Sequence, residues 1–423
     1  ISDQKPLSYH LEKTENIIVP LRRPDSRTFA TRSISLVANH FPVKFNPSGI
    51  IMHYAVHAKL VSSIGHKPLK RSIPKSLMGL LKEQLFFNEP KSFPSDLVAY
   101  DGERNIFSAV PLPSGDFKVE ISHGDDITSC SYIVTIKKMN ELKLSRLKEY
   151  LNGDLLYIPR DILHGMDLVM KENPSKYRIR LGRNFFCKNY REGDDLKHGV
   201  AAYRGFQQSL KPTSQGLSLC LDYSVLSFLK PLPVLEFLKE NIEGFREGFR
   251  EADDATRMRR QVLNALKGLK VRVTHRITKQ KFTISGLTEK VAGELWFDLV
   301  DADPQAPPKK INIVDFFWQK YEKEIRHLNI PCLDLGNANK IHYVPMEFCI
   351  LVVGQRYPKE RLDRKTASFL KKLSLAPPEE RRRTICDMVQ AKDGPDGYVL
   401  FITKSLCVFT LHLSFFFHCF GLG

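Results

Sequence analysis

The sequence lacks the cysteine spacing that disulfide scaffolds and structural zinc sites require. Its eight cysteines are scattered along 423 residues, and no two of them form a CxxC pair. Disulfide-rich secreted domains and zinc ribbons are therefore excluded as descriptions of this chain. A reducing compartment suits free cysteines best, so we expect a location in the cytoplasm, the nucleus or both.

Other signatures are missing as well. No charged segment followed by an apolar run stands near the first residue, so no secretory signal is predicted. Acidic residues are scarce relative to basic ones, because 47 Asp and Glu stand against 64 Lys and Arg, a formal net charge of +17. This surplus favours an anionic partner: nucleic acid first, and an acidic membrane surface or an acidic protein second.

The last stretch, residues 405–423, contains no Asp, Glu, Lys or Arg, and its length would allow a membrane span. His412, His418 and the absence of flanking charge at the chain end count against a membrane anchor. A buried core segment is a further alternative. We favour a segment produced by truncation or intron read-through, and we expect no membrane partner.

The length predicts two to four domains, and the residue patterns predict an α+β multidomain protein. After an N-terminal edge, residues 1–14, we predict an α+β domain over residues 15–172. Its expected strands include RSISLVANHFPVKF and IIMHYAVHAKL, and a helix is expected in MNELKLSRLKEYLNG, ending at Gly153. His53 and His57 share one strand face; without a third ligand nearby in sequence, a polar sheet surface is favoured over a zinc site.

The rest of the chain divides by composition into four further parts. Residues 173–232 are predicted to form a first linker packed as a small sheet. Residues 233–354 begin with a helical pattern in PLPVLEFLKENIEGF and then alternate like strands around a further helix, which predicts an OB-like β-barrel with an inserted αβ module. Residues 355–396 are charged and helical in two pieces, broken at prolines 377 and 378, as expected of a second linker. Residues 397–423 form an atypical hydrophobic tail.

The segment INIVDFFWQKY, residues 311–321, supplies the helix of the predicted αβ module. Asn312 can cap this helix, and Asp315 suits its first turn. At about 100° per residue, the helical wheel places a core stripe on one side. The predicted stripe consists of Val314, Phe317, Trp318, Tyr321 and Ile325.

Phe316 falls outside that stripe, and Lys320 lies one turn further along on the same side of the helix. An aromatic ring beside a cation is what a stacked base and its phosphate need. Core packing alone does not explain this pair, so we predict a nucleotide contact there. The alternative is a single exposed aromatic, which is common on protein surfaces.

Several motifs, in consistent order, resemble those of plant Argonaute proteins. KGLKVRVTHR, ELWFDL, IVDFFWQKY and HYVPMEFCILVVGQR look like successive parts of a PAZ domain. VANHFPV, GRNFF and YRGFQQSLKP resemble the Argonaute N domain and first linker. The similarity runs from about residue 15 to about residue 396. It implies a role in RNA silencing, in which the PAZ domain holds the two-nucleotide 3′ end of a small guide RNA.

The resemblance also assigns roles to residues. His275 matches a phosphate-contacting histidine, and Phe297 matches the phenylalanine under the terminal nucleotide. Without the family, His275 would be interpreted as an ordinary surface histidine. The predicted site that binds the RNA 3′ end consists of His275, Lys281, Phe282, Phe297, Phe316, Lys320, Tyr321, Tyr343 and Val344.

Three positions depart from the family pattern. Phe282 and Phe316 stand where many relatives carry Tyr, and Gln280 stands where they carry Arg. Each change from Tyr to Phe keeps a stacking face and removes a donor, a loss of roughly 0.5 to 1.5 kcal/mol per hydrogen bond. We therefore expect a weaker grip on phosphate.

In the family, RNA cleavage belongs to a PIWI domain that uses Mg²⁺, and a MID domain holds the guide's 5′ phosphate. The resemblance stops before both, so we expect no slicer activity, no cofactor and no metal. The expected partners are small single-stranded or duplex RNAs with a 3′ overhang, and silencing-complex proteins. A Dicer-like RNase is a competing interpretation, disfavoured because no P-loop occurs. A basic scaffold, or a membrane-tethered interaction protein, is another.

Overall fold

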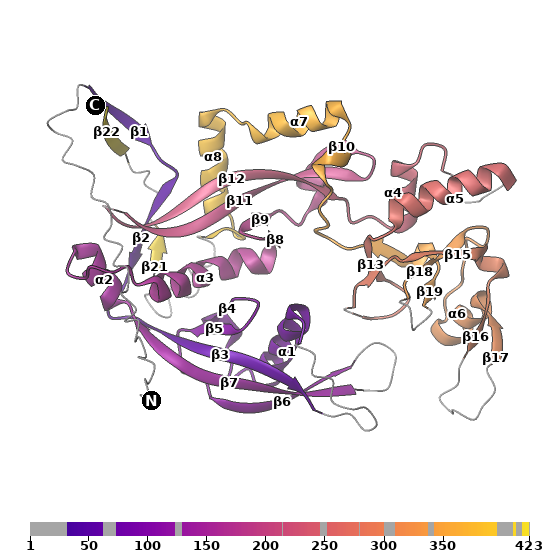
Figure 1. Cartoon of the computed structure of the whole chain (residues 1–423), viewed down its shortest axis with the longest axis horizontal. Helices are drawn as coiled ribbons and strands as arrows, with labels where there is room; N and C mark the ends of the chain where they lie inside the picture. Colours follow the sequence, from indigo (N-terminus) through magenta and orange to yellow (C-terminus); the bar gives the residue numbers. More distant parts are fainter. Residues whose placement is uncertain are drawn as a thin grey trace, which may run out of the picture.

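The computed structural model describes residues 32–61, 73–122, 129–213, 215–245, 252–278, 280–299, 309–336, 342–395, 409–411 and 417–422. The predicted N-terminal edge, residues 1–14, lies outside these ranges. The structure is α+β, as predicted, with several antiparallel sheets. Figure 1 shows a curved sheet at the bottom, a long hairpin above it, and a separate group of short strands and helices at one end.

A five-stranded antiparallel sheet forms the N-terminal region, in the order β4-β5-β3-β7-β6. One face packs against α1 (Lys75–Asn88), with Tyr54 and Leu81 in the shared core. The other face packs against α3, with Phe107 in a second core. The strands are β3 (Ile50–Leu60), β4 (Val98–Tyr100), β5 (Asn105–Ser108), β6 (Gly115–Ser122) and β7 (Ser129–Lys143), and a 3-10 turn, η2 (Ser95–Leu97), precedes β4.

The two histidines considered for zinc lie on β3. The His53 ring stacks on Phe107 with centroids 4.7 Å apart, and its Nε2 lies 2.9 Å from Asn105 Oδ1. His57 is exposed. The described residues contain no group of three potential metal ligands.

The predicted helix over residues 139–153 is half right. Residues up to Lys143 belong to β7, and α2 covers only Ser145–Asn152. Strand pairing with β3 takes precedence over the helical spacing of the first residues, since Asn140 to Lys143 lie opposite His53 to Ile50. The end is confirmed, because Gly153 adopts the left-handed conformation (φ 92°) that favours glycine after a helix.

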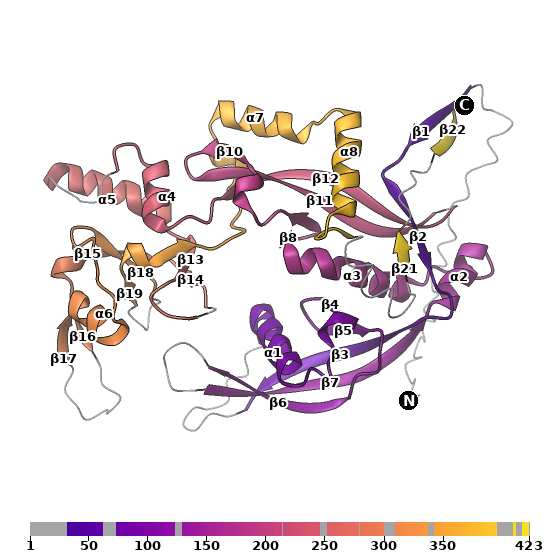
Figure 2. The ribbon, with the colours of Figure 1, turned by 180° about the vertical axis from the view of Figure 1, so that it is seen from behind.

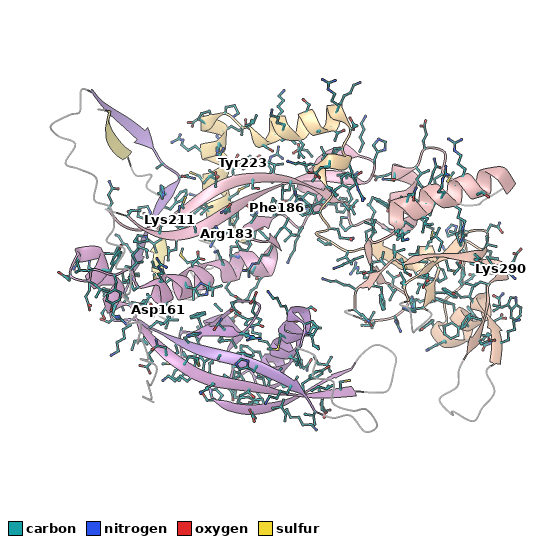
Figure 3. All side chains as sticks on the ribbon, in the orientation of Figure 1. Asp161, Arg183, Phe186, Lys211, Tyr223 and Lys290 are labelled. Carbon is teal, nitrogen blue, oxygen red and sulfur yellow. The ribbon has the colours of Figure 1, made fainter. Side chains whose placement is uncertain are left out.

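The long hairpin belongs to a seven-stranded sheet in the order β21-β2-β12-β11-β9-β8, with β10 beside β11. Helices α3 and α8 pack against this sheet and share a core with it, while α7 runs along β12 (Figures 1 and 2). Figure 3 places Tyr223 on β12 below α7 and α8. The elements are β2 (His40–Phe45), α3 (Arg160–Tyr177), β8 (Ile179–Leu181), β9 (Asn184–Phe186), η3 (Tyr190–Glu192), β10 (Asp194–Lys197), β11 (Val200–Thr213), β12 (Gly216–Leu229), η6 (Lys359–Arg361), α7 (Arg364–Ser374) and α8 (Pro378–Gln390).

The region predicted as a β-barrel divides into small sheets. Their orders are β14-β13-β20, β15-β18-β19 and β16-β17, and the described strands form no closed barrel. The β16-β17 hairpin followed directly by α6 corresponds to the predicted inserted unit. The elements are α4 (Val234–Asn241), α5 (Ala252–Leu266), β13 (Lys270–Val273), β14 (Phe282–Thr283), β15 (Gly286–Val291), η4 (Ala292–Glu294), β16 (Trp296–Leu299), β17 (Lys309–Asn312), α6 (Ile313–Tyr321), β18 (Pro331–Asp334), β19 (Tyr343–Val344), η5 (Met346–Phe348) and β20 (Cys349–Leu351).

The described parts of the tail are strands. β21 (Phe409–Leu411) pairs antiparallel with β2, and β22 (Phe417–Leu422) pairs antiparallel with β1 (Arg32–Val37). Within the described residues, no helix has the length and apolar character needed to cross a membrane. The last described strand, β22, thus lies beside the first described strand, β1 (Figure 1).

One buried side chain ties the segment after α8 to α3. Asn173 on α3 is 3% exposed, and its Nδ2 donates to Lys392 O at 2.8 Å and to Gly394 O at 2.7 Å. Beside it, Arg178 pairs with Asp393 at 2.8 Å. The carbonyl of Gly394 is buried and would stay desolvated without a partner if it lost this donor, so the clamp contributes to stability.

Replacement of Asn173 by Ala is expected to destabilise the chain by about 1–3 kcal/mol, because both carbonyls lose a donor. Urea unfolding followed by circular dichroism measures the change. Asn152→Ala, at an exposed position at the end of α2, is the matched control and should change stability by less than about 0.5 kcal/mol. Equal stability of the two variants would show that the clamp contributes nothing.

Candidate nucleic-acid interface

His275 lies two residues after β13 and is 6% exposed. The residue before it, Thr274, donates its backbone amide to Phe348 O. Its ring lies 4.6 Å from that of Tyr321 and 5.0 Å from that of Phe317, measured between centroids. His275 is therefore part of an aromatic cluster, and the interpretation as an ordinary surface histidine is wrong.

Local sequence defines the start and the end of α6. The Asn312 side chain accepts a hydrogen bond from Val314 N at 2.8 Å, which confirms the predicted cap, and its Nδ2 donates to Gly293 O at 3.1 Å. At the other end Glu322 has φ 52°, and its amide donates to Trp318 O. The helix is thus limited to nine residues.

The buried side of α6 is narrower than the predicted stripe. Ile313 and Phe317 are each 1% exposed, and Phe317 stacks on Phe348 with centroids 5.4 Å apart and an angle of 8°. Trp318 is 63% exposed, so its place in the predicted core is wrong. The short helix packs along the line of Ile313 and Phe317, and Trp318 lies about 100° away from that line. Ile325 is buried, but it follows the helix rather than belonging to it.

The predicted ring and cation of α6 lie together on the side of the aromatic cluster. Lys320 Nζ is 5.5 Å from the ring centroid of Phe316 and 5.6 Å from that of Tyr321. Phe316 is half-buried and meets the ring of Phe297 at 5.2 Å in an edge-on arrangement. Phe316 and Tyr321 are themselves 5.8 Å apart. The structure therefore brings five predicted residues into one group: His275, Phe297, Phe316, Lys320 and Tyr321.

A second group of side chains adjoins the first, because Arg276 directly follows His275 in the chain. Its neighbour Arg276 places its guanidinium 5.8 Å from the ring centroid of Phe282, and His342 meets the same ring at 4.9 Å. Phe282 is 8% exposed, whereas Lys281 is exposed. This group combines buried ring packing with cations at the surface.

Two further predicted residues lie on β19. Tyr343 is half-buried, and Val344 is 1% exposed, opposite Leu333 on β18. The Val344 side chain contributes to the core of this region. Its predicted place in the lining of the site remains a prediction.

The thiols beneath the site are inert. Burial raises the pKa of Cys332 on β18 to about 12, and burial also raises the pKa of Cys349 on β20. Both therefore stay neutral thiols near pH 7, which removes them as nucleophiles. The chemistry available at the surface is stacking on rings and attraction of anions by cations.

Three contributors to the site were not predicted: Arg276, His342 and Phe348. Arg276 follows the predicted His275, His342 precedes the predicted Tyr343, and Phe348 contacts the ring of His275. A single basic, imidazole or aromatic residue in a short strand or turn has no periodicity, so no sequence pattern identified these three. Only the folded chain shows that Arg276 turns towards Phe282 while its neighbour His275 turns towards α6.

Three families match this chain in succession. Residues 32–170 match the N-terminal domain of argonaute, residues 180–230 match the Argonaute linker 1 domain, and residues 235–370 match the PAZ domain. The chain carries these three domains of the argonaute family. The group around α6 therefore lies in a PAZ domain.

Relatives from plants agree with this assignment. The chain is 37% identical to rice Protein argonaute 2 over 89% of its length and 34% of that protein, and 32% identical to Arabidopsis thaliana Protein argonaute 10 over 87% of its length and 36% of that protein. It therefore spans about a third of the length of these relatives. Kluyveromyces polysporus Argonaute, solved with a guide RNA, shares the fold, with a TM-score of 0.59 at 17% identity over 91% of this chain and 44% of that one.

The cap of α6 can be tested separately from any ligand. Asn312→Ala removes the acceptor for Val314 N, which is expected to cost about 0.5–2 kcal/mol and to speed amide exchange in α6 by about 2- to 30-fold. Hydrogen–deuterium exchange followed by mass spectrometry of residues 313–321 measures it. Asn312→Asp retains the acceptor for Val314 N but loses the donor to Gly293 O, so its exchange rate should lie between those of the parent and the Ala variant. Unchanged exchange in the Ala variant would mean that tertiary packing alone holds the helix.

Proposed function

We propose that this chain binds the 3′ end of a small RNA through its PAZ domain. The observation that carries the proposal is the position of Lys320, whose ammonium lies 5.5 Å from the ring centroid of Phe316 and 5.6 Å from that of Tyr321, the ring that His275 meets at 4.6 Å. Rings offer stacking faces to bases, and the ammonium attracts a phosphate. The nine residues predicted as the RNA 3′-end site are part of this proposal, with His275 and Lys320 as the phosphate contacts.

We further propose that this span of the chain binds RNA without cutting it. The resemblance assigns cleavage to a PIWI domain, whereas the three matched domains are the N-terminal, linker 1 and PAZ domains. Incubation of the chain with labelled RNA and Mg²⁺ should leave the RNA intact. Site-specific cleavage that is lost on addition of EDTA would contradict a purely binding role.

End recognition predicts a preference among RNAs of equal charge. A duplex with two-nucleotide 3′ overhangs should bind at least about tenfold more tightly than a blunt duplex with the same number of phosphates, a difference of about 1.4 kcal/mol. Fluorescence anisotropy at fixed salt measures both affinities. Equal affinities, lost together as salt rises, would favour the alternative of a basic scaffold that binds any polyanion.

Lys320→Gln should weaken RNA binding and lower the slope of log affinity against log salt by about 0.7, the contribution of one phosphate on a single strand. Lys290→Gln is the matched control, because Lys290 is an exposed cation on β15 of the same domain (Figure 3). An equal loss in both variants would mean that only the net charge of the domain matters.

Phe316→Tyr restores the hydroxyl that many relatives carry. It should tighten binding to the overhanging RNA by about 2- to 10-fold, the effect of one added hydrogen bond. Phe87→Tyr, at a position that is 81% exposed on α1, makes the same chemical change outside the PAZ domain and should have no effect. Unchanged or weaker binding of the Phe316 variant would place the RNA on another face of α6.

A further inference from the structure

Helix α7 carries a surface feature that the proposed RNA 3′-end site does not use. Its sequence, RKTASFLKKLS, contains four cations and no acidic residue. An open hollow of about 500 Å³ lies on its outer face, lined by Arg364, Lys365, Ser368, Phe369 and Lys372. A hydroxyl therefore lies among cations on a solvent-facing surface.

The helical geometry centres the cations on the hydroxyl. At about 100° per residue, positions three and four residues before and after Ser368 fall within about 60° of it. These positions hold Arg364, Lys365, Lys371 and Lys372. The helix buries its opposite side, where Leu370 is 9% exposed and Leu373 O accepts a hydrogen bond from the Tyr223 hydroxyl.

Neither the four cations nor the hydroxyl is committed to another group. Within the part of the chain that the structure describes, none of the four cations forms a salt bridge, although α8 forms two close by. The other α7 hydroxyls are engaged: Thr366 donates to the Asp363 carboxylate, and Ser374 donates to Leu370 O at 2.9 Å. Among the described residues Ser368 has no such bond and is exposed.

We propose that Ser368 is a phosphorylation site for a basophilic serine/threonine kinase, and that the cations of α7 hold the resulting phosphate. Such kinases select serines by basic residues on the N-terminal side, here Arg364 and Lys365. The Ser368 Oγ attacks the γ-phosphorus of ATP, the new O–P bond replaces the bond to ADP, and the hydroxyl proton passes to the catalytic base of the kinase. The phosphate adds about −1.5 to −2 charge, about half of the positive charge of α7.

The helix does not bar a kinase from the site. A kinase needs an extended segment, and α7 is eleven residues long with Leu370 as its buried residue. Helices of this length are marginal without packing, so local opening costs far less than unfolding of the domain. Once the kinase leaves, the helix re-forms, and the phosphate meets cations one turn away on either side.

Phosphorylation is tested on the intact chain with a panel of purified basophilic kinases and Mg·ATP, followed by mapping by mass spectrometry. A peptide of residues 361–374 tests whether the kinases recognise the sequence around Ser368 outside the folded protein. Phosphate on Ser368 in both, reduced in the double variant Arg364→Gln and Lys365→Gln and absent in Ser368→Ala, supports the proposal. No modification of the peptide, modification of the peptide but not of the chain, or equal modification of Ser374 would overturn it.

The second claim, that the cations hold the phosphate, needs its own readout. Phosphoserine installed at position 368 during translation allows a ³¹P NMR titration of the folded chain. The pKa of the phosphate should fall below its usual value of about 6, because the dianion is favoured beside cations. Lys372→Gln should bring the pKa back towards that value, while Lys290→Gln should not. A pKa near 6 in all three proteins would overturn the claim.

Discussion

The ladder between β11 and β12 is the interaction on which the rest of the molecule depends. The two strands pair continuously from Val200 opposite Leu229 to Thr213 opposite Gly216. The N-terminal side joins this ladder through β2, and the segment before α7 joins it where Tyr357 N donates to Ser227 O. Gly205 allows β9 to approach, because a Cβ there would lie 2.4 Å from Phe185 O. One hairpin thus connects parts that are distant in sequence (Figure 1).

Within the PAZ domain, fold and site share the same side chains. Phe317 is 1% exposed, stacks on Phe348 and contacts the rings of His275, Phe316 and Tyr321. A change of core volume at this position would therefore move the surface rings as well. The precision of the candidate site comes from a packed helix only nine residues long, held at its start by a side-chain cap.

Sequence reasoning succeeded where one local rule decides the outcome. The cap at Asn312, the helix end at Gly153 and the pairing of Phe316 with Lys320 each depend on neighbours within four residues. It failed where partners distant in the chain decide: residues 139–143 form a strand because β3 lies beside them, and Trp318 faces solvent because no element covers that side of α6 among the described residues. Arg276 shows the same limit, since its ring partner Phe282 is set by the fold.

Phe282 and Phe316, where the resemblance to the family leads us to expect tyrosine, are not equivalent in this structure. Phe282 is 8% exposed and packed between His342 and the guanidinium of Arg276, so a hydroxyl there would need a partner in a largely dry site. Phe316 is half-buried and has the ammonium of Lys320 beside its ring. The ammonium can still attract a phosphate, but the ring of Phe316 has no donor to add to it. Under the proposed function, weaker phosphate contact is therefore expected at the half-buried Phe316, whereas at Phe282 the substitution favours packing.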